Sequence, residues 1–206
     1  MGDNVGYTPG TGKVIAADDV AGALHQRIKI SLGDDGTAVD LDGTQTHGAW
    51  VNPRRLVKRV AGTYTNDVPG AYVSGDAIGK GVTFASAARA NAGVGHIRSV
   101  SLIDLAKQNA AVDVLFVQEI TSYVPTDNGV FAPSDANLTA MGVLGVVSFV
   151  GGDYQSYDVN SVATKQVLLP FICGAATTSI FAYLISRGTP TYAASDLTPV
   201  LGFEQL

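Results

Sequence analysis

The feature that most constrains the fold is a run of short apolar segments, separated by turns that contain Gly, Pro, Asn or Asp. From about residue 79 these segments follow one another to the end of the chain, as in Gly95–Leu105, Ala111–Ile120 and Leu197–Gln205. Long helical periodicity is almost absent. Regularly spaced short strands of this kind are typical of a β-sandwich or barrel. The sequence therefore predicts an all-β body, sandwich or jelly-roll-like.

The clearest single strand pattern lies near the N-terminus, in Ala23–Leu32, where apolar and polar side chains alternate with period two before a turn at Gly33–Gly36. One short helical turn is expected at Ser134–Ala140, with Ser134 as its N-cap. The remaining predicted strands are Ala38–Leu41, Gly81–Ala87, Gly142–Val150, Val159–Leu169 and Ser179–Arg187.

These patterns divide the chain into an N-terminal arm, residues 1–22, and a single β-sandwich domain, residues 23–206. Within the domain, residues 44–76 form a long loop-rich region with little periodicity. This region holds the chain's basic cluster, Arg54, Arg55, Lys58 and Arg59. The cluster could be a basic patch, or the solvated side of a short helix that begins at Asn52-Pro53, and the second interpretation is favoured because charge runs usually lie on a solvated face.

The composition indicates a protein that buries part of its surface in contacts with partner proteins. Charged residues make up only 15% of the chain, hydrophobic residues 46%, and mean hydropathy is +0.21. A formal net charge of −5 gives no basic face for nucleic acid. We expect no secretion signal and no membrane partner, because no apolar run is long enough. Cys173 stands alone, so an intrachain disulfide is impossible.

No catalytic, cofactor or metal site is predicted. The histidines His25, His47 and His96 are not spaced like a metal-binding pair. Acidic pairs such as Asp34-Asp35 lack the spacing of a calcium loop and are interpreted as turn residues. The Gly12-Lys13 dipeptide lacks the rest of a phosphate loop. We therefore expect a non-enzymatic protein.

Two segments carry a resemblance to known proteins. Ile15–Ile30, and Leu169-Pro170-Phe171 followed by Ser186–Tyr192 and Asp196–Thr198, resemble virion structural proteins of tailed bacteriophages. Val82–Arg89 and Ala140–Phe149 fit the same group, whereas residues 33–76 depart from it. The resemblance implies a capsid decoration (cement) protein, assembled in the host cytoplasm and placed on the outer surface of the capsid in the virion.

In this reading the protein bridges neighbouring copies of the major capsid protein, its partner, as a homotrimer that stabilises the capsid. We expect interface anchors at Tyr7 in the arm, at Trp50, and at Arg54 or Arg55. Each has a simpler interpretation as a disordered terminus, a core tryptophan or a solvated arginine. A tail, baseplate or fibre component remains the first alternative, and a carbohydrate-binding or hydrolytic β-sandwich the second.

Overall fold

A computed structural model describes residues 17–20, 23–26, 31–32, 39–40, 56–63 and 70–206. The chain divides into two units, Met1–Pro53 and Arg54–Leu206. This division does not follow the boundary expected after residue 22, and the predicted domain limits stay a prediction.

The described residues of the first unit form four short strands. Strands β1 (Ala17–Val20) and β2 (Ala23–Gln26) pair antiparallel, as do β3 (Ser31–Leu32) and β4 (Val39–Asp40). The two ends of the predicted strand Ala23–Leu32 therefore lie in different two-stranded sheets.

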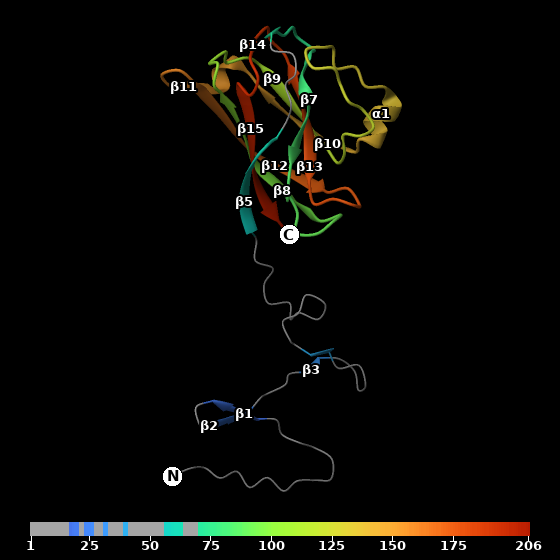
Figure 1. Cartoon of the computed structure of the whole chain (residues 1–206), viewed down its shortest axis with the longest axis vertical. Coiled ribbons are helices and arrows are strands. Elements are labelled where there is room, and N and C mark those ends of the chain that lie inside the picture. The colour runs from blue at the N-terminus through green and yellow to red at the C-terminus, as the bar shows by residue number, and fades with distance from the viewer. Residues whose placement is uncertain (1–16, 21–22, 27–30, 33–38, 41–55, 64–69) are drawn as a thin grey trace. The chain divides into compact units, whose positions relative to one another are not determined.

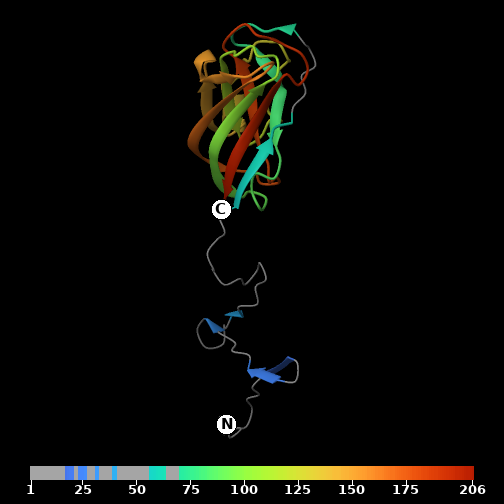
Figure 2. The ribbon, with the colours of Figure 1, turned by 90° about the vertical axis from the view of Figure 1, so that its left-hand side faces the viewer.

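The second unit is an all-β body built from two antiparallel sheets, as the sequence predicts (Figure 1). Figure 2 shows the larger sheet in front, with its long strands side by side. Strands β6 (Gly70–Ala71) and β14 (Thr191–Tyr192) form a further small pair. In spatial order, the four-stranded sheet consists of β10 (Val143–Phe149), β9 (Val112–Val117), β13 (Ile180–Ser186) and β7 (Ala77–Phe84), and the five-stranded sheet of β11 (Tyr154–Ser156), β12 (Ser161–Ile172), β8 (Val94–Asp104), β15 (Leu197–Gln205) and β5 (Leu56–Ala61).

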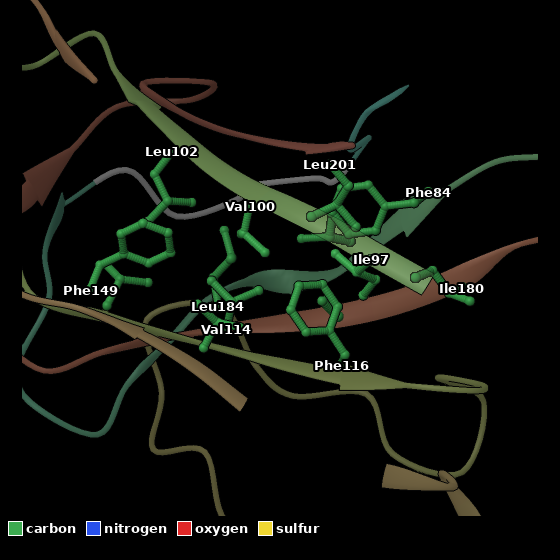
Figure 3. Close-up of a cluster of buried hydrophobic side chains, with 14 of the residues drawn as sticks. Phe84, Ile97, Val100, Leu102, Val114, Phe116, Phe149, Ile180, Leu184 and Leu201 are labelled. Atoms are coloured by element: carbon green, nitrogen blue, oxygen red, sulfur yellow. The ribbon is translucent and has the colours of Figure 1, made fainter. Parts of the chain in front are cut away.

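The main core fills the space between the two sheets (Figure 3). Val100 and Leu102 of β8 face Val114 and Phe116 of β9, and all four side chains are fully buried. Aromatic rings join the layers: the Phe84 ring lies 6.4 Å from Phe116 in its own sheet and 6.5 Å from Phe203 in the other. Since these contacts bury large apolar surfaces, they supply most of the cohesion between the sheets.

A second, smaller cluster lies on the opposite face of the four-stranded sheet. It consists of Leu115, Val117, Met141, Tyr183 and Ile185, with Ile120, Tyr123, Phe131 and Phe181 packed against it. Several of these residues come from the connection between β9 and β10. The four-stranded sheet is therefore covered on both faces, which explains why β13 is buried along almost its whole length.

That connection also holds the one α-helix among the described residues, α1 (Asp135–Ala140), and a short 3-10 helix, Gly151–Asp153, follows β10. The Ser134 Oγ accepts a hydrogen bond from the Asn137 backbone N–H at 3.2 Å, so the predicted cap is confirmed. Because the helix is only six residues long, it depends on this cap and on the packing of its flanks. No helix in the described part of the chain has the length and apolarity needed to cross a membrane.

The prediction of a short helix beginning at Asn52-Pro53 is wrong for its described part. Leu56–Ala61 is strand β5, which pairs antiparallel with β15 at the edge of the five-stranded sheet. Its side chains alternate in exposure, with Lys58 and Val60 half-buried and Arg59 and Ala61 exposed. Pairing with a strand far along the sequence outweighs the local helical spacing, as edge pairing often does. The region 44–76 thus contains regular structure at β5 and β6.

Candidate interaction surface

All four predicted interface residues, Tyr7, Trp50, Arg54 and Arg55, lie outside the described residues. Their roles stay predictions. The described body shows a different candidate, which is the outer face of its five-stranded sheet. This face points away from the core, and no other described element packs a hydrophobic cluster against it.

The strand register defines which side chains share this face. Ser101 of β8 lies opposite Thr164 of β12 on one side and Val200 of β15 on the other, and Val200 in turn lies opposite Ala61 of β5. On one side, the row of Gln166, Ser99 and Gly202 ends at Arg59 of β5, and on the other, the row of Val162, Ile103 and Thr198 has no partner in β5. We call this set the uncharged face, because none of its members carries a charge: Ala61, Ser99, Ser101, Ile103, Val162, Thr164, Gln166, Thr198, Val200 and Gly202.

Direct contacts confirm that these side chains lie together. The hydroxyls of Ser101 and Thr164 are hydrogen-bonded at 2.9 Å across the β8–β12 pair. The Ser99 Oγ lies over Gly202, where a Cβ built on the glycine would come within 2.5 Å of it. Such cross-strand pairs hold neighbouring side chains flat against the sheet. The uncharged face is therefore broad and low in relief.

Charged groups on the outer face gather at its other end, near the chain terminus. Arg98 interrupts β8 where the register shifts, and its guanidinium lies 3.7 Å from the Glu204 carboxylate. The Glu204 side chain is only 8% exposed. Arg59 of β5 lies opposite Gly202. The charges thus border the uncharged face on one side instead of interrupting it.

Exposed apolar side chains continue the surface past these charges. Ile172 and Val94 pair across β12 and β8, and the Leu206 backbone N–H donates to the Val94 carbonyl at 3.3 Å. Each exposes 43–49% of its surface, and Val57 on β5 exposes 74%. We call these four residues the apolar margin. Ile172, Val94 and Leu206 are neighbours, whereas Val57 lies opposite Glu204. Single exposed apolar residues are ordinary, but neighbouring ones are typical of an interaction site.

One side of the sandwich also carries an open strand edge. Strand β11 pairs only with Ser161–Ala163, so the rest of β12 has no strand partner on that side among the described residues. The neighbouring edge strand of the other sheet is β10, where Gly145 approaches the Leu169 side chain. Exposed Leu168 and Val146 lie on these two edge strands. The interaction surface therefore extends around this edge.

A shallow groove of about 450 Å³ lies along the edge of β7, lined by Lys80, Gly81, Thr83, Ile120 and nearby side chains. It contains no carboxylate, histidine or cysteine among its lining residues. Within the described ranges, no group of three or more His, Cys, Asp or Glu residues is placed to hold a metal ion.

Acidic side chains in the body organise loops instead. The Asp127 carboxylate, almost fully buried, accepts hydrogen bonds from the Tyr72 hydroxyl at 2.9 Å and the Gly79 N–H at 2.8 Å. Glu119 accepts bonds from the Thr121 and Ser122 side chains, and these bonds lower the pKa of its carboxyl against the opposing effect of burial. Turn chemistry of this kind needs no ligand.

Sequence reasoning missed the uncharged face, although part of its signal was present. The alternation of Ser99, Ser101 and Ile103 with buried residues is visible within β8 alone. What could not be seen is that the same uncharged parity of β12 and β15 lies beside it. No protein-family model matches the chain, and no curated protein matches it.

Proposed function

We propose that this chain is a non-enzymatic structural protein that binds a protein lattice through the uncharged face and the apolar margin. In a tailed-phage particle, which the sequence resemblance suggests, that lattice would be the shell of major capsid protein. The chain would then act as a decoration protein, homotrimeric and on the outer capsid surface. The observation that carries the proposal is the absence of charge from the uncharged face, while the charged groups of the same sheet, Arg59, Arg98 and Glu204, lie at its border.

Charge depletion supports a protein partner because of what burial costs. The core of a protein interface is depleted of Lys, Glu and Asp, since each would have to lose its hydration without full compensation. The outer face of an antiparallel sheet that stays in water normally carries polar residues. Here the polar residues are small hydroxyls and a glutamine without charge, and β-branched apolar residues lie among them. Such residues can be dehydrated at low cost, and their hydroxyls can bond across an interface.

The size of the face suits a stable contact. Five strands about 4.8 Å apart span roughly 19 Å, and ten steps of about 3.3 Å along Val94–Asp104 span roughly 33 Å. The product, on the order of 600 Å², is the whole outer face of the sheet, with the apolar margin and the charged groups included, and it is near the roughly 800 Å² that each partner buries in a standard interface. The β12 edge adds to this area. A sugar-binding function is less favoured, because no tyrosine, tryptophan or phenylalanine lies among the residues of the uncharged face.

The test is to place a single charge on the uncharged face, beside Ser101, and measure binding to the particle. Thr164 is exposed on β12, so Thr164→Lys leaves the fold intact and adds an ammonium group to the proposed interface. An unpaired charge buried there costs about 3–5 kcal/mol, so affinity for capsids that lack the protein is expected to fall by at least roughly 100-fold. Co-sedimentation with such particles measures this loss.

Ala136→Lys on the exposed surface of α1 is the matched control, because it adds the same charge away from the five-stranded sheet. It is expected to bind as the wild type does. Both variants should show the wild-type circular dichroism spectrum and unfolding midpoint. Wild-type binding by Thr164→Lys would overturn the proposed interface. Binding only to tails, equally affected by the lysine, would keep the interface and move the protein to the tail.

A further inference from the structure

The body contains a buried polar site at one end of the sandwich, separate from the proposed interface. Asp104 is the last residue of β8, and Ser161, the first residue of β12, lies directly opposite it in the antiparallel pair. Both are fully buried, at 0% exposure. Directly opposed residues have Cβ atoms about 5 Å apart. A carboxylate and a hydroxyl are therefore held close together on the core side of the sheet.

Four buried oxygens around this point have no hydrogen-bond partner among protein atoms: Asp104 Oδ1, Asn109 Oδ1, Tyr154 Oη and Ser161 Oγ. The other polar atoms of two of these residues are bonded. Asp104 Oδ2 accepts from the Asn109 N–H at 2.8 Å and from the Tyr192 hydroxyl at 3.4 Å, and Asn109 Nδ2 donates to Ser156 Oγ at 3.4 Å. These bonds fix the carboxylate and the amide, so their free oxygens cannot easily turn away.

Tyr154 brings the fourth oxygen from the adjacent strand. It lies opposite Ala163, two residues from Ser161 on the same face, and its ring packs against the main core. Burial raises the pKa of the Tyr154 phenol, and the negative charge of Asp104 raises it further. The phenol oxygen thus lies within electrostatic reach of the carboxylate, on the same side of the sheet as Ser161.

The donors and acceptors of this group balance. Asp104 Oδ1 and Asn109 Oδ1 can only accept, whereas the Ser161 and Tyr154 hydroxyls can each donate. A water molecule donates two hydrogen bonds and accepts two. Buried polar groups left without partners are uncommon, and buried waters typically bridge them with about three bonds each.

We propose that the site formed by Asp104, Asn109, Tyr154 and Ser161 binds one structural water molecule, which joins the loop after β8 and strand β11 to the ends of β8 and β12. A hard metal cation fits less well, because it offers nothing to accept the two hydroxyl protons. Calcium would also need six to eight oxygen ligands, and this group supplies one carboxylate. The water would add to the hydrogen bonds that Lys107 donates from the same loop to the carbonyls of Tyr157 and Asp158.

A high-resolution crystal structure of the full chain tests the proposal directly. It is expected to show one density peak about 2.7–3.2 Å from at least three of the four oxygens. In solution, water-selective NMR should show a long-lived water near the Ser161 amide proton. Direct pairing of the four oxygens with no peak between them would overturn the proposal. So would a peak with six or more oxygen ligands at about 2.3–2.6 Å, which identifies calcium.

Two conservative variants give an independent readout in the same protein. Ser161→Ala and Tyr154→Phe each remove one hydroxyl, and each is expected to lower Tm by about 2–4 °C because one buried bond to the water is lost. Ser148→Ala, at an exposed position of β10, is the control and should leave Tm unchanged. An unchanged Tm in both hydroxyl variants would show that these groups bind nothing, and would contradict the proposal.

Discussion

Replacing Phe203 with alanine should destabilise the body by about 4 kcal/mol. Phe203 is fully buried, and its ring lies 6.5 Å from Phe84 in the opposite sheet and 5.7 Å from Phe171 in its own. Truncating a buried phenylalanine typically costs about 3–5 kcal/mol through lost transfer free energy and the cavity left behind. Loss of two aromatic contacts places this site in the upper part of that range.

Equilibrium unfolding in urea, followed by circular dichroism, measures the effect. The midpoint should fall while the slope with denaturant stays constant, because the surface exposed on unfolding is unchanged. Domains of this size are stable by about 5–15 kcal/mol, so a loss of this size is a large part of the total. Phe203→Leu is the second variant, which keeps an apolar side chain in the core and should lose roughly a third as much.

Leu168→Ala is the control for this experiment. Its side chain is 66% exposed on β12, so the free energy of unfolding should change by less than about 0.5 kcal/mol. A loss below about 1 kcal/mol in Phe203→Ala would refute the reasoning, because the two sheets would then not share a tightly packed core at this residue.

Three further predictions concern local features. Ser134→Ala removes the cap of α1 and should speed amide hydrogen exchange in that helix, with a loss of about 1 kcal/mol in local stability. Gly95→Ala would place a Cβ 2.5 Å from the Glu204 carbonyl oxygen, so a thermal melt should show a loss of about 1–3 kcal/mol, whereas Gly152→Ala, with open space around it, should be close to neutral. Burial raises the pKa of the Asp104 carboxyl above its unfolded value. The contribution of this group to the free energy of unfolding is therefore present below its unfolded pKa and is lost as pH rises through its folded pKa. Asp104→Asn should flatten this part of the curve of stability against pH, and a curve identical to the wild type would contradict the assignment.

Strands with a strong local pattern could be predicted closely. Leu197–Gln205 matches β15 at both ends, and Gly95–Leu105 matches β8 to within one residue. Strand β8 alternates between a buried side and an outer side over most of its length, which is the signal that period-two reasoning detects, whereas β15 is buried at most of its positions. The Ser134 cap was equally local, because an N-cap depends on residues within one turn.

Features decided by distant partners could not be predicted. Leu56–Ala61 has helical spacing of apolar residues, yet becomes β5 because β15 offers it a partner. Strand β12 continues through Pro170 to Ile172, beyond the predicted end at Leu169. Proline has no N–H to donate to a neighbouring strand. Beyond Ala163, the open edge of β12 has no strand partner among the described residues that would need this hydrogen bond, so Pro170 is tolerated there.

The candidate surface could not be predicted from the sequence, for the same reason. The uncharged face combines residues from β5, β8, β12 and β15, which are distant in sequence and adjacent only after the sheet has formed. The predicted anchors relied on aromatic and basic residue types in segments of little periodicity. Residue type indicates what a side chain could bind, whereas the sheet register determines which side chains act together.

A three-dimensional reconstruction of the particle that contains this chain tests the central claim most directly. The account predicts many copies over the shell, each with the outer face of its five-stranded sheet against the underlying protein lattice and with Ser101 and Thr164 excluded from solvent. A reconstruction in which that face points into solvent, with the chain held by another surface, would contradict it.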